Sequence, residues 1–242
     1  MARLYGRHAL ASRGKDNDAP GPRGTPTLDG DSVYAIGTEG EVVCLDAATG
    51  EARWRKSMVR DYNGRKMSDW KFSESPLVDG DRVVFTPDSF DALMAAVDKR
   101  TGKEIWRAGG GARVGSAGSN GAGYASMMIS EGAGVKQYVQ LAGRGLFGVR
   151  AADGKVLWNY NRIANDIANI PTPVVRGDYV FAATGYQTGS VLLKLERTAD
   201  GVAAQEVYFL GAHTFQHGGF VLVGDSIYGL HFLHHPVGDL GD

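Results

Sequence analysis

Three tryptophans at a constant spacing limit what this chain can fold into more than any other feature. Trp54, Trp106 and Trp158 follow one another at intervals of 52 residues, and similar residues surround each of them. Self-similarity at a fixed period of about 20–50 residues is the signature of solenoids, propellers and other repeat folds. The sequence therefore predicts a chain of repeated units that bury their apolar faces against one another.

Each tryptophan closes a short turn motif. In the second unit the motif is Asp98, two further residues, Thr101-Gly102 and then Trp106. The Asp side chain can cap the turn amides, and Gly can take the left-handed backbone conformation. Over the first three units, the predicted structural positions of this motif are Asp46, Gly50, Trp54, Asp98, Thr101, Gly102, Trp106, Gly154 and Trp158.

Two units depart from the motif. The third has Arg150 where the others have Asp, and the fourth has Tyr208 where Trp would stand. In the fourth unit we expect a longer loop through Asp200-Gly201 in place of the tight turn.

Two further markers keep the same order along the chain. An Asp-Gly or Gly-Asp pair separates two β-rich runs at residues 29–31, 79–81, 177–178 and 224–225, and it is a strong hairpin signal. A hydroxyl residue and a proline precede the first run at Thr25-Pro26, Ser75-Pro76 and Thr172-Pro173. Most of the 35 glycines thus punctuate turns.

Each unit is predicted to form four short strands, which in unit two are residues 76–78, 82–86, 93–97 and 104–107. We see no convincing helix. Four strands in each repeat of about 40–50 residues are typical of a propeller blade. The predicted fold is an all-β propeller of four-stranded antiparallel blades. The predicted boundaries are a polar lead-in at 1–20, blades at 25–56, 75–108, 125–160 and 172–209, the start of a fifth at 217–229, and an atypical tail at 230–242.

The motif from Ala96 to Trp106 resembles the tryptophan-docking motif of the PQQ-like β-propeller repeat family, which includes quinoprotein alcohol dehydrogenases and BamB-like proteins. The resemblance covers about residues 21–229 and is specific for the fold rather than for a function. Propellers of this family close with seven or eight blades, so the resemblance implies that these blades are part of an incomplete ring. A small propeller of four or five blades is the alternative.

The resemblance leaves three functions open. The first is a non-catalytic scaffold of the bacterial cell envelope or periplasm that binds other proteins, as in envelope assembly, or a small ligand, and needs no cofactor. The second is a quinoprotein alcohol dehydrogenase, which would hold PQQ with Ca²⁺. The third is the sensor domain of a larger protein. Many such dehydrogenases carry a vicinal disulfide, but Cys44 is the single cysteine of this chain. We therefore assign no catalytic residue and predict no metal site.

Polar residues gather where the chain enters the first strand of each unit, which in a propeller lines the central channel. These candidate ligand residues at the channel mouth are Arg23, Glu74, Tyr124, Asn169 and His217. Arg, Glu and Asn side chains could bind an ion. Alternatively, they satisfy turn amides.

Trp70 is the one tryptophan outside the repeat, in the long loop 60–71. It could contact a partner, because aromatic residues dominate binding hot spots, or it could fold back over its own blade.

Charge balance and apolar patterning argue against nucleic-acid binding, a membrane span and a signal peptide. With 26 basic and 27 acidic residues the net charge is -1, which gives no footprint for nucleic acid. No apolar run approaches the roughly 18 residues of a membrane span. Residues 1–20 are polar and contain no signal-peptide core.

Overall fold

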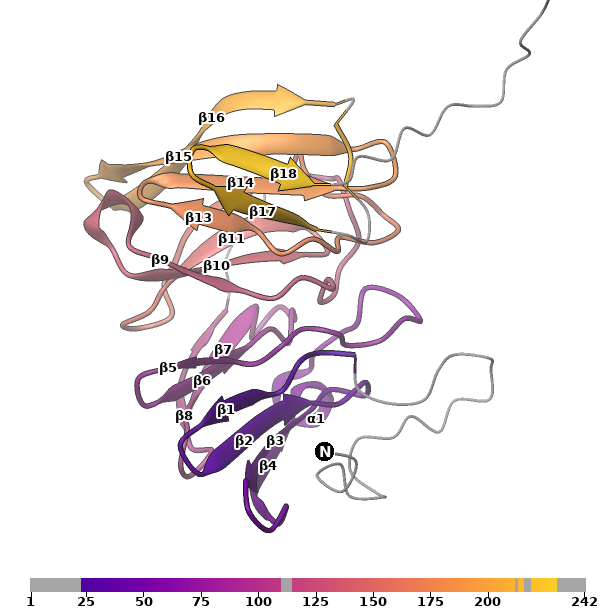
Figure 1. The fold of residues 1–242 in the computed structure, drawn as a ribbon, viewed down its shortest axis with the longest axis vertical. Coiled ribbons are helices and arrows are strands. Elements are labelled where there is room, and N and C mark those ends of the chain that lie inside the picture. Colours follow the sequence, from indigo (N-terminus) through magenta and orange to yellow (C-terminus); the bar gives the residue numbers. More distant parts are fainter. Residues whose placement is uncertain (1–22, 110–114, 212, 216–218, 230–242) are drawn as a thin grey trace, which may run out of the picture.

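The computed structural model describes residues 23–109, 115–211, 213–215 and 219–229. The predicted lead-in 1–20 and tail 230–242 lie outside these residues. The described residues form four antiparallel sheets of four strands and a two-stranded hairpin, in chain order (Figure 1). This architecture confirms the prediction of an all-β propeller with four blades and the start of a fifth.

Each blade is a simple meander, in which every strand pairs with its neighbour in sequence. Blade one holds β1 (Thr27–Asp29), β2 (Ser32–Ile36), β3 (Glu41–Asp46) and β4 (Ala52–Ser57). Blade two holds β5 (Leu77–Asp79), β6 (Arg82–Phe85), β7 (Met94–Asp98) and β8 (Glu104–Ala108). Blade three holds β9 (Met128–Ser130), β10 (Gln137–Ala142), β11 (Gly145–Arg150) and β12 (Val156–Tyr160). Blade four holds β13 (Val174–Arg176), β14 (Tyr179–Thr184), β15 (Gly189–Thr198) and β16 (Gly201–Leu210), and the hairpin holds β17 (Phe220–Val223) and β18 (Ser226–Gly229).

A β-bulge recurs at the same register position in every complete blade. Trp54 pairs with Cys44, and the register shifts between Cys44 and Leu45. Trp106, Trp158 and the blade-four residue Tyr208 pair with the residue before an equivalent shift. Tyr208 therefore occupies the register position of the missing tryptophan. Because a bulge increases local twist, it turns the outer strand of each blade in the same way.

The prediction of no helix was wrong at one place, where the chain leaves blade one. α1 (Met58–Tyr62) is a single five-residue helix, and a 3₁₀ turn also occurs at Gly132–Gly134. The Ser57 hydroxyl accepts from the amide of Arg60, while the Asp61 carboxylate accepts from the amide of Ser57. These reciprocal caps and the burial of Met58 and Tyr62 on one face explain why this segment coils.

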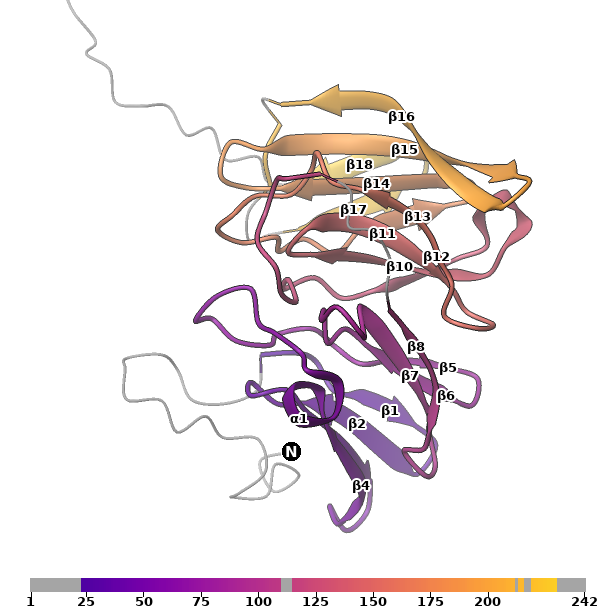
Figure 2. The ribbon, with the colours of Figure 1, turned by 180° about the vertical axis from the view of Figure 1, so that it is seen from behind.

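Blade four also differs from expectation. Instead of a long loop through Asp200, β15 and β16 are ten residues each and continue to a tight turn at residues 199–200. The two strands pair without interruption from Thr198–Gly201 down to Leu193–Glu206. This β15–β16 ribbon replaces the docking turn of the other blades and is visible from behind in Figure 2.

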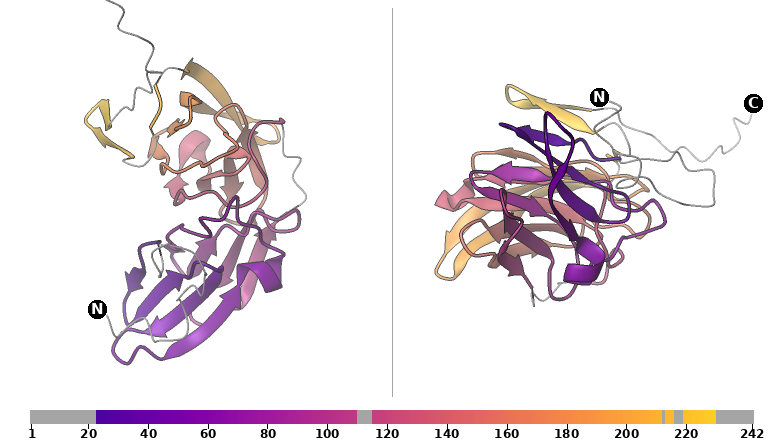
Figure 3. Two further views of the ribbon diagram at one scale, coloured as in Figure 1. Left: turned by 90° about the vertical axis from the view of Figure 1, so that its right-hand side faces the viewer. Right: turned by 90° about the horizontal axis from the view of Figure 1, so that it is seen from below.

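The blades follow one another in an open arc, with blade one at one end and the β17–β18 hairpin at the other (Figure 3). The first strands of successive blades contact each other at β1 with β5, β9 with β13, and β13 with β17. Buried clusters fill the junctions between blades; Tyr34 and Phe85, for example, belong to the cluster shared by blades one and two. The core is thus a series of apolar layers between sheets.

Candidate functional site

A chain of hydroxyl groups connects the blades at the entrance to their first strands. The amide of Thr25 donates to the Ser75 hydroxyl (2.9 Å), and the amide of Ser75 donates to the Ser126 hydroxyl (3.0 Å). The amide of Ser126 donates in turn to the Thr172 hydroxyl (3.0 Å). Two hydroxyls of the hydroxyl-proline marker, those of Ser75 and Thr172, therefore have a structural role, because each accepts a hydrogen bond from a main-chain amide of the preceding unit. Ser126, which no proline follows, does the same for Ser75.

Glu74 lies just behind this relay and is buried, with 2% of its surface exposed. Its Oε1 accepts from the amide of Thr86 (2.6 Å), and its Oε2 accepts from the Gln140 side chain of blade three (3.0 Å). Burial raises the pKa of Glu74 from 4.5 to about 7, against the opposing effect of these hydrogen bonds. Glu74 thus connects two blades from inside the core and does not line an open channel.

Asn169 is also fully buried and satisfied by its own chain. Its Nδ2 donates to the carbonyl oxygens of Ala142 (3.0 Å) and Gly143 (3.2 Å), and its Oδ1 accepts from the amide of Asn165 (3.1 Å). Asn169 therefore connects the loop 161–173, in which it lies, to the turn after β10 by side-chain hydrogen bonds. Both Glu74 and Asn169 accept hydrogen bonds from backbone amides, as the alternative interpretation of the sequence expects, and their role as ligand residues stays a prediction.

Three other candidates come together on the surface of this end of the molecule. The Trp70 and Tyr124 rings meet edge to face, with centroids 6.1 Å apart. The Arg23 guanidinium donates to the Trp70 carbonyl (2.5 Å), and the Tyr124 hydroxyl bonds to the Ser68 hydroxyl. Trp70 keeps 43% of its surface exposed. We call Arg23, Trp70 and Tyr124 the entrance cluster; the remaining candidate, His217, lies outside the described residues.

The docking motif joins blade one to blade two and blade two to blade three. The Trp54 indole nitrogen donates to the carbonyl of Lys99 in blade two (2.9 Å), and its ring covers Gly102 of the same blade. Gly102 has a φ of +70°, and a Cβ there would lie 2.8 Å from the ring. Trp106 repeats this contact on blade three, where its nitrogen donates to the Ala151 carbonyl (3.1 Å).

The polar residues of the motif stabilise the turn itself. Asp98 Oδ1 accepts from the amide and the hydroxyl of Thr101 (2.8 and 2.7 Å), and Asp46 makes the same contacts in blade one. Where blade three has Arg150 in place of Asp, its guanidinium pairs with Asp153 (Nε–Oδ1 2.8 Å). An ion pair thus substitutes for the missing cap.

The third junction breaks the pattern. The Trp158 indole nitrogen donates to Gln137 Oε1 (2.6 Å), which belongs to its own blade, because blade four offers no docking turn. A cleft of about 970 Å³ opens here between the turns of blades two, three and four. The cleft was not predicted from the sequence, although the degenerate motif of unit four marks its position.

Comparisons with known proteins fit this architecture. Residues 8–231 match the family model described as outer membrane protein assembly factor BamB. This chain belongs to that family. BamB from Moraxella catarrhalis has a similar structure, with a TM-score of 0.58 and 17% identity, over 86% of this chain and 57% of the BamB chain. At this identity the likeness shows the fold alone.

Quinone enzymes are similar over shorter stretches. The 1-butanol dehydrogenase (quinone) of Thauera butanivorans is 30% identical over 80 residues, which is 31% of this chain and 12% of the enzyme. The quinohemoprotein alcohol dehydrogenase ADHIIG of Pseudomonas putida has a TM-score of 0.41 at 17% identity, over 75% of this chain and 34% of its own. The chain therefore spans little more than half of the BamB structure and a smaller part of these enzymes.

Among the described residues, no group of three or more His, Cys, Asp or Glu side chains is placed to share a metal ion. None of the helices in the described part of the chain has the length and hydropathy that crossing a membrane requires.

Proposed function

We propose that this protein is a non-catalytic scaffold that binds other proteins in the bacterial cell envelope. The observation that carries the proposal is the match of residues 8–231 to the model of an outer membrane assembly factor. The periplasm is the compartment that this family membership suggests. The resemblance to such a factor supplies the class of partner, namely other envelope proteins.

The entrance cluster is the proposed contact surface. Aromatic and Arg residues dominate binding hot spots, and Trp70 is held by Arg23 and Tyr124 while 43% of it stays exposed. In a four-stranded meander the connections after the second and fourth strands lie at the same end of the blade. The exposed side chains Phe90 and Ile167 belong to such connections and extend the apolar surface at this end.

The second candidate is a quinone-dependent alcohol dehydrogenase, which the 30% identity to the Thauera enzyme over 80 residues favours. PQQ and Ca²⁺ would need side-chain oxygens that face the ligand. Glu74 and Asn169 are the carboxylate and the amide among the candidate channel-mouth residues, and their oxygens accept hydrogen bonds from the protein's own chain. These residues do not fit the cofactor, so we derive no step through it.

Photo-crosslinking from position 70 tests the scaffold proposal. A photoreactive amino acid replaces Trp70 in the full chain in bacterial cells, and Ile105 on β8, 44% exposed, serves as the matched control position. We expect discrete crosslinks to envelope proteins from position 70 and none from position 105. Equal patterns from both positions, or no crosslink from position 70, would overturn the proposal.

A further inference from the structure

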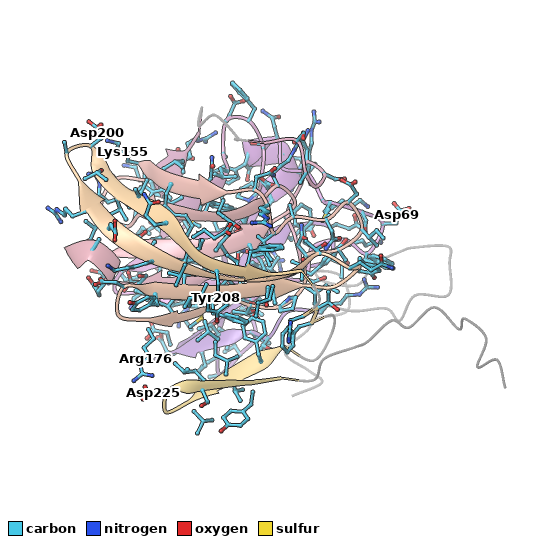
Figure 4. The ribbon with its side chains drawn as sticks, turned by 90° about the horizontal axis from the view of Figure 1, so that it is seen from above. Asp69, Lys155, Arg176, Asp200, Tyr208 and Asp225 are labelled. Atoms are coloured by element: carbon cyan, nitrogen blue, oxygen red, sulfur yellow. The ribbon has the colours of Figure 1, made fainter. Side chains whose placement is uncertain are left out.

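The cleft at the third junction is lined by charged side chains from four turns. Its five cations are Arg82, Lys136, Arg150, Lys155 and Arg197, and its acidic side chains are Asp79, Asp81 and Asp200. Figure 4 shows Lys155 and Asp200 together at the end of the β15–β16 ribbon, on the side of the molecule away from Asp69, which directly precedes Trp70 of the entrance cluster. The cleft is therefore separate from the proposed protein-contact surface.

Three of the five cations already interact with protein groups that include a carboxylate. The Arg82 guanidinium donates to the carbonyl of Ala151 and interacts electrostatically with the Asp79 carboxylate, and the Lys136 ammonium pairs with Asp79 (2.7 Å). Arg150 pairs with Asp153 at the turn after β11. These three cations line the cleft and already interact with groups of the protein itself.

The other two cations have only main-chain partners. Lys155 Nζ donates to the carbonyl of Asp200 (3.0 Å), and Arg197 Nη1 approaches the carbonyls of Ala133 (3.3 Å) and Gly134 (3.4 Å). Within the described residues, neither Lys155 nor Arg197 forms an ion pair. Lys155 reaches from blade three to blade four and Arg197 reaches back, so two positive charges without an ion-pair partner among the described residues lie across one junction.

We propose that this cleft binds a small multivalent oxyanion, with Lys155 and Arg197 as its charge partners. An Arg fork and a Lys point charge are the side chains that recognise phosphate and carboxylate groups. The volume of about 970 Å³ is at the upper end of the range for small-molecule pockets.

Titration calorimetry at low salt, with inorganic pyrophosphate and with citrate in separate experiments, tests the site on the full chain. Lys155→Ala and Arg197→Ala should each weaken binding about tenfold, the equivalent of ~1.4 kcal/mol. Lys103→Ala is the matched control, because Lys103 follows the turn glycine of blade two as Lys155 follows that of blade three. Binding of pyrophosphate alone identifies a phosphate ligand, and binding of both probes identifies a general oxyanion site; either supports the proposal.

A second variant is expected to raise the affinity for the probe, and it leaves Lys155 and Arg197 in place. Asp81→Asn removes a carboxylate from the cleft wall, so it should tighten binding severalfold. The proposal is overturned if neither probe binds at millimolar concentration, if Lys103→Ala weakens binding as much as Lys155→Ala, or if Asp81→Asn leaves affinity unchanged. None of these results bears on crosslinking from position 70, so the two proposals fail independently.

Discussion

Gly102 shows how a single residue decides whether two blades join. Its φ of +70° disfavours any side chain, and a Cβ there would meet the Trp54 ring at 2.8 Å. Gly80 has a similar φ of +58° but nothing within 4 Å. Alanine at either position strains the backbone by about 1 kcal/mol or more, and only Gly102→Ala also displaces the tryptophan.

We therefore expect Gly102→Ala to lower the free energy of unfolding by about 2 kcal/mol more than Gly80→Ala, since an overpacked contact costs ~1–3 kcal/mol. Urea denaturation of the two variants measures the difference. Equal losses would show that the ring contact contributes nothing to the junction.

Glu74 makes stability depend on pH in a direction opposite to that of most carboxylates. Its pKa rises from 4.5 to about 7 on folding, because burial penalises the charged form. The stabilisation is complete below pH 4.5 and is lost as the pH rises to about 7, and above that it stays lost. The shift corresponds to at most about 3 kcal/mol.

Glu74→Gln should remove this dependence. Between pH 4.5 and 7, the free energy of unfolding of the parent should fall relative to that of the variant. Carboxylates with lowered pKa, such as Asp46 and Asp153 at about 2, act in the reverse direction below pH 4 and are common to both proteins. Denaturant curves at several pH values measure the effect; parallel pH profiles would contradict the burial of Glu74.

The residue types of the docking motif could be predicted from the sequence because they recur at a fixed spacing. The partners of Glu74 could not, since Gln140 lies within an ordinary apolar strand and carries no local signal. Nor could the sequence predict that the indole of Trp158 makes a different contact from that of Trp54. Its contact depends on a turn that blade four lacks, which is a property of another segment of the chain.

The hydroxyl relay operates between strands of different blades. Ser126→Ala removes the acceptor for the amide of Ser75, and we expect a loss of about 1–2 kcal/mol in the free energy of unfolding. Ser126→Thr is the matched control, because Thr172 serves the same purpose in blade four. Thermal or urea unfolding of both variants measures the loss. A loss as large in Ser126→Thr would mean that volume, and not the hydroxyl, decides stability here.

Strand positions could be predicted to within one or two residues in blade two, because hairpin turns and β-rich runs alternate there. The sequence was misleading in blade four. Without a docking glycine, its third and fourth strands continue to pair as far as Thr198 and Gly201 and form the β15–β16 ribbon. The short α1 was missed because its signal is a capping pair rather than a periodic apolar stripe.

The whole molecule presents an apolar surface at the C-terminal end of its arc. A groove of about 750 Å³ lies between blade four and the β17–β18 hairpin, and its lining includes Phe181, Leu192 and Leu222. On the hairpin, Val221 and Val223 are 60% and 61% exposed. Exposed apolar faces and strand edges promote association. We expect sedimentation velocity to show concentration-dependent self-association, and a monodisperse monomer with one sharp melting transition would contradict this.

The arrangement of blades could be predicted from the repeat, whereas the cleft at the third junction could not, because turns of three different blades line it. Function is harder to predict from the sequence than the strands or the arrangement of blades. Residues 8–231 match the model of an assembly factor, and 80 residues of the chain are similar to a quinone enzyme, so fold alone does not decide the function.

The choice between a scaffold and a quinone enzyme is tested most directly by an assay of alcohol-dependent dye reduction. The full chain is incubated with PQQ and Ca²⁺, beside a quinohemoprotein alcohol dehydrogenase as positive control. We predict no turnover above the level of PQQ and Ca²⁺ alone, because Glu74 and Asn169 hold the protein's own chain. Dye reduction that requires the protein and disappears when PQQ is omitted would contradict the scaffold proposal.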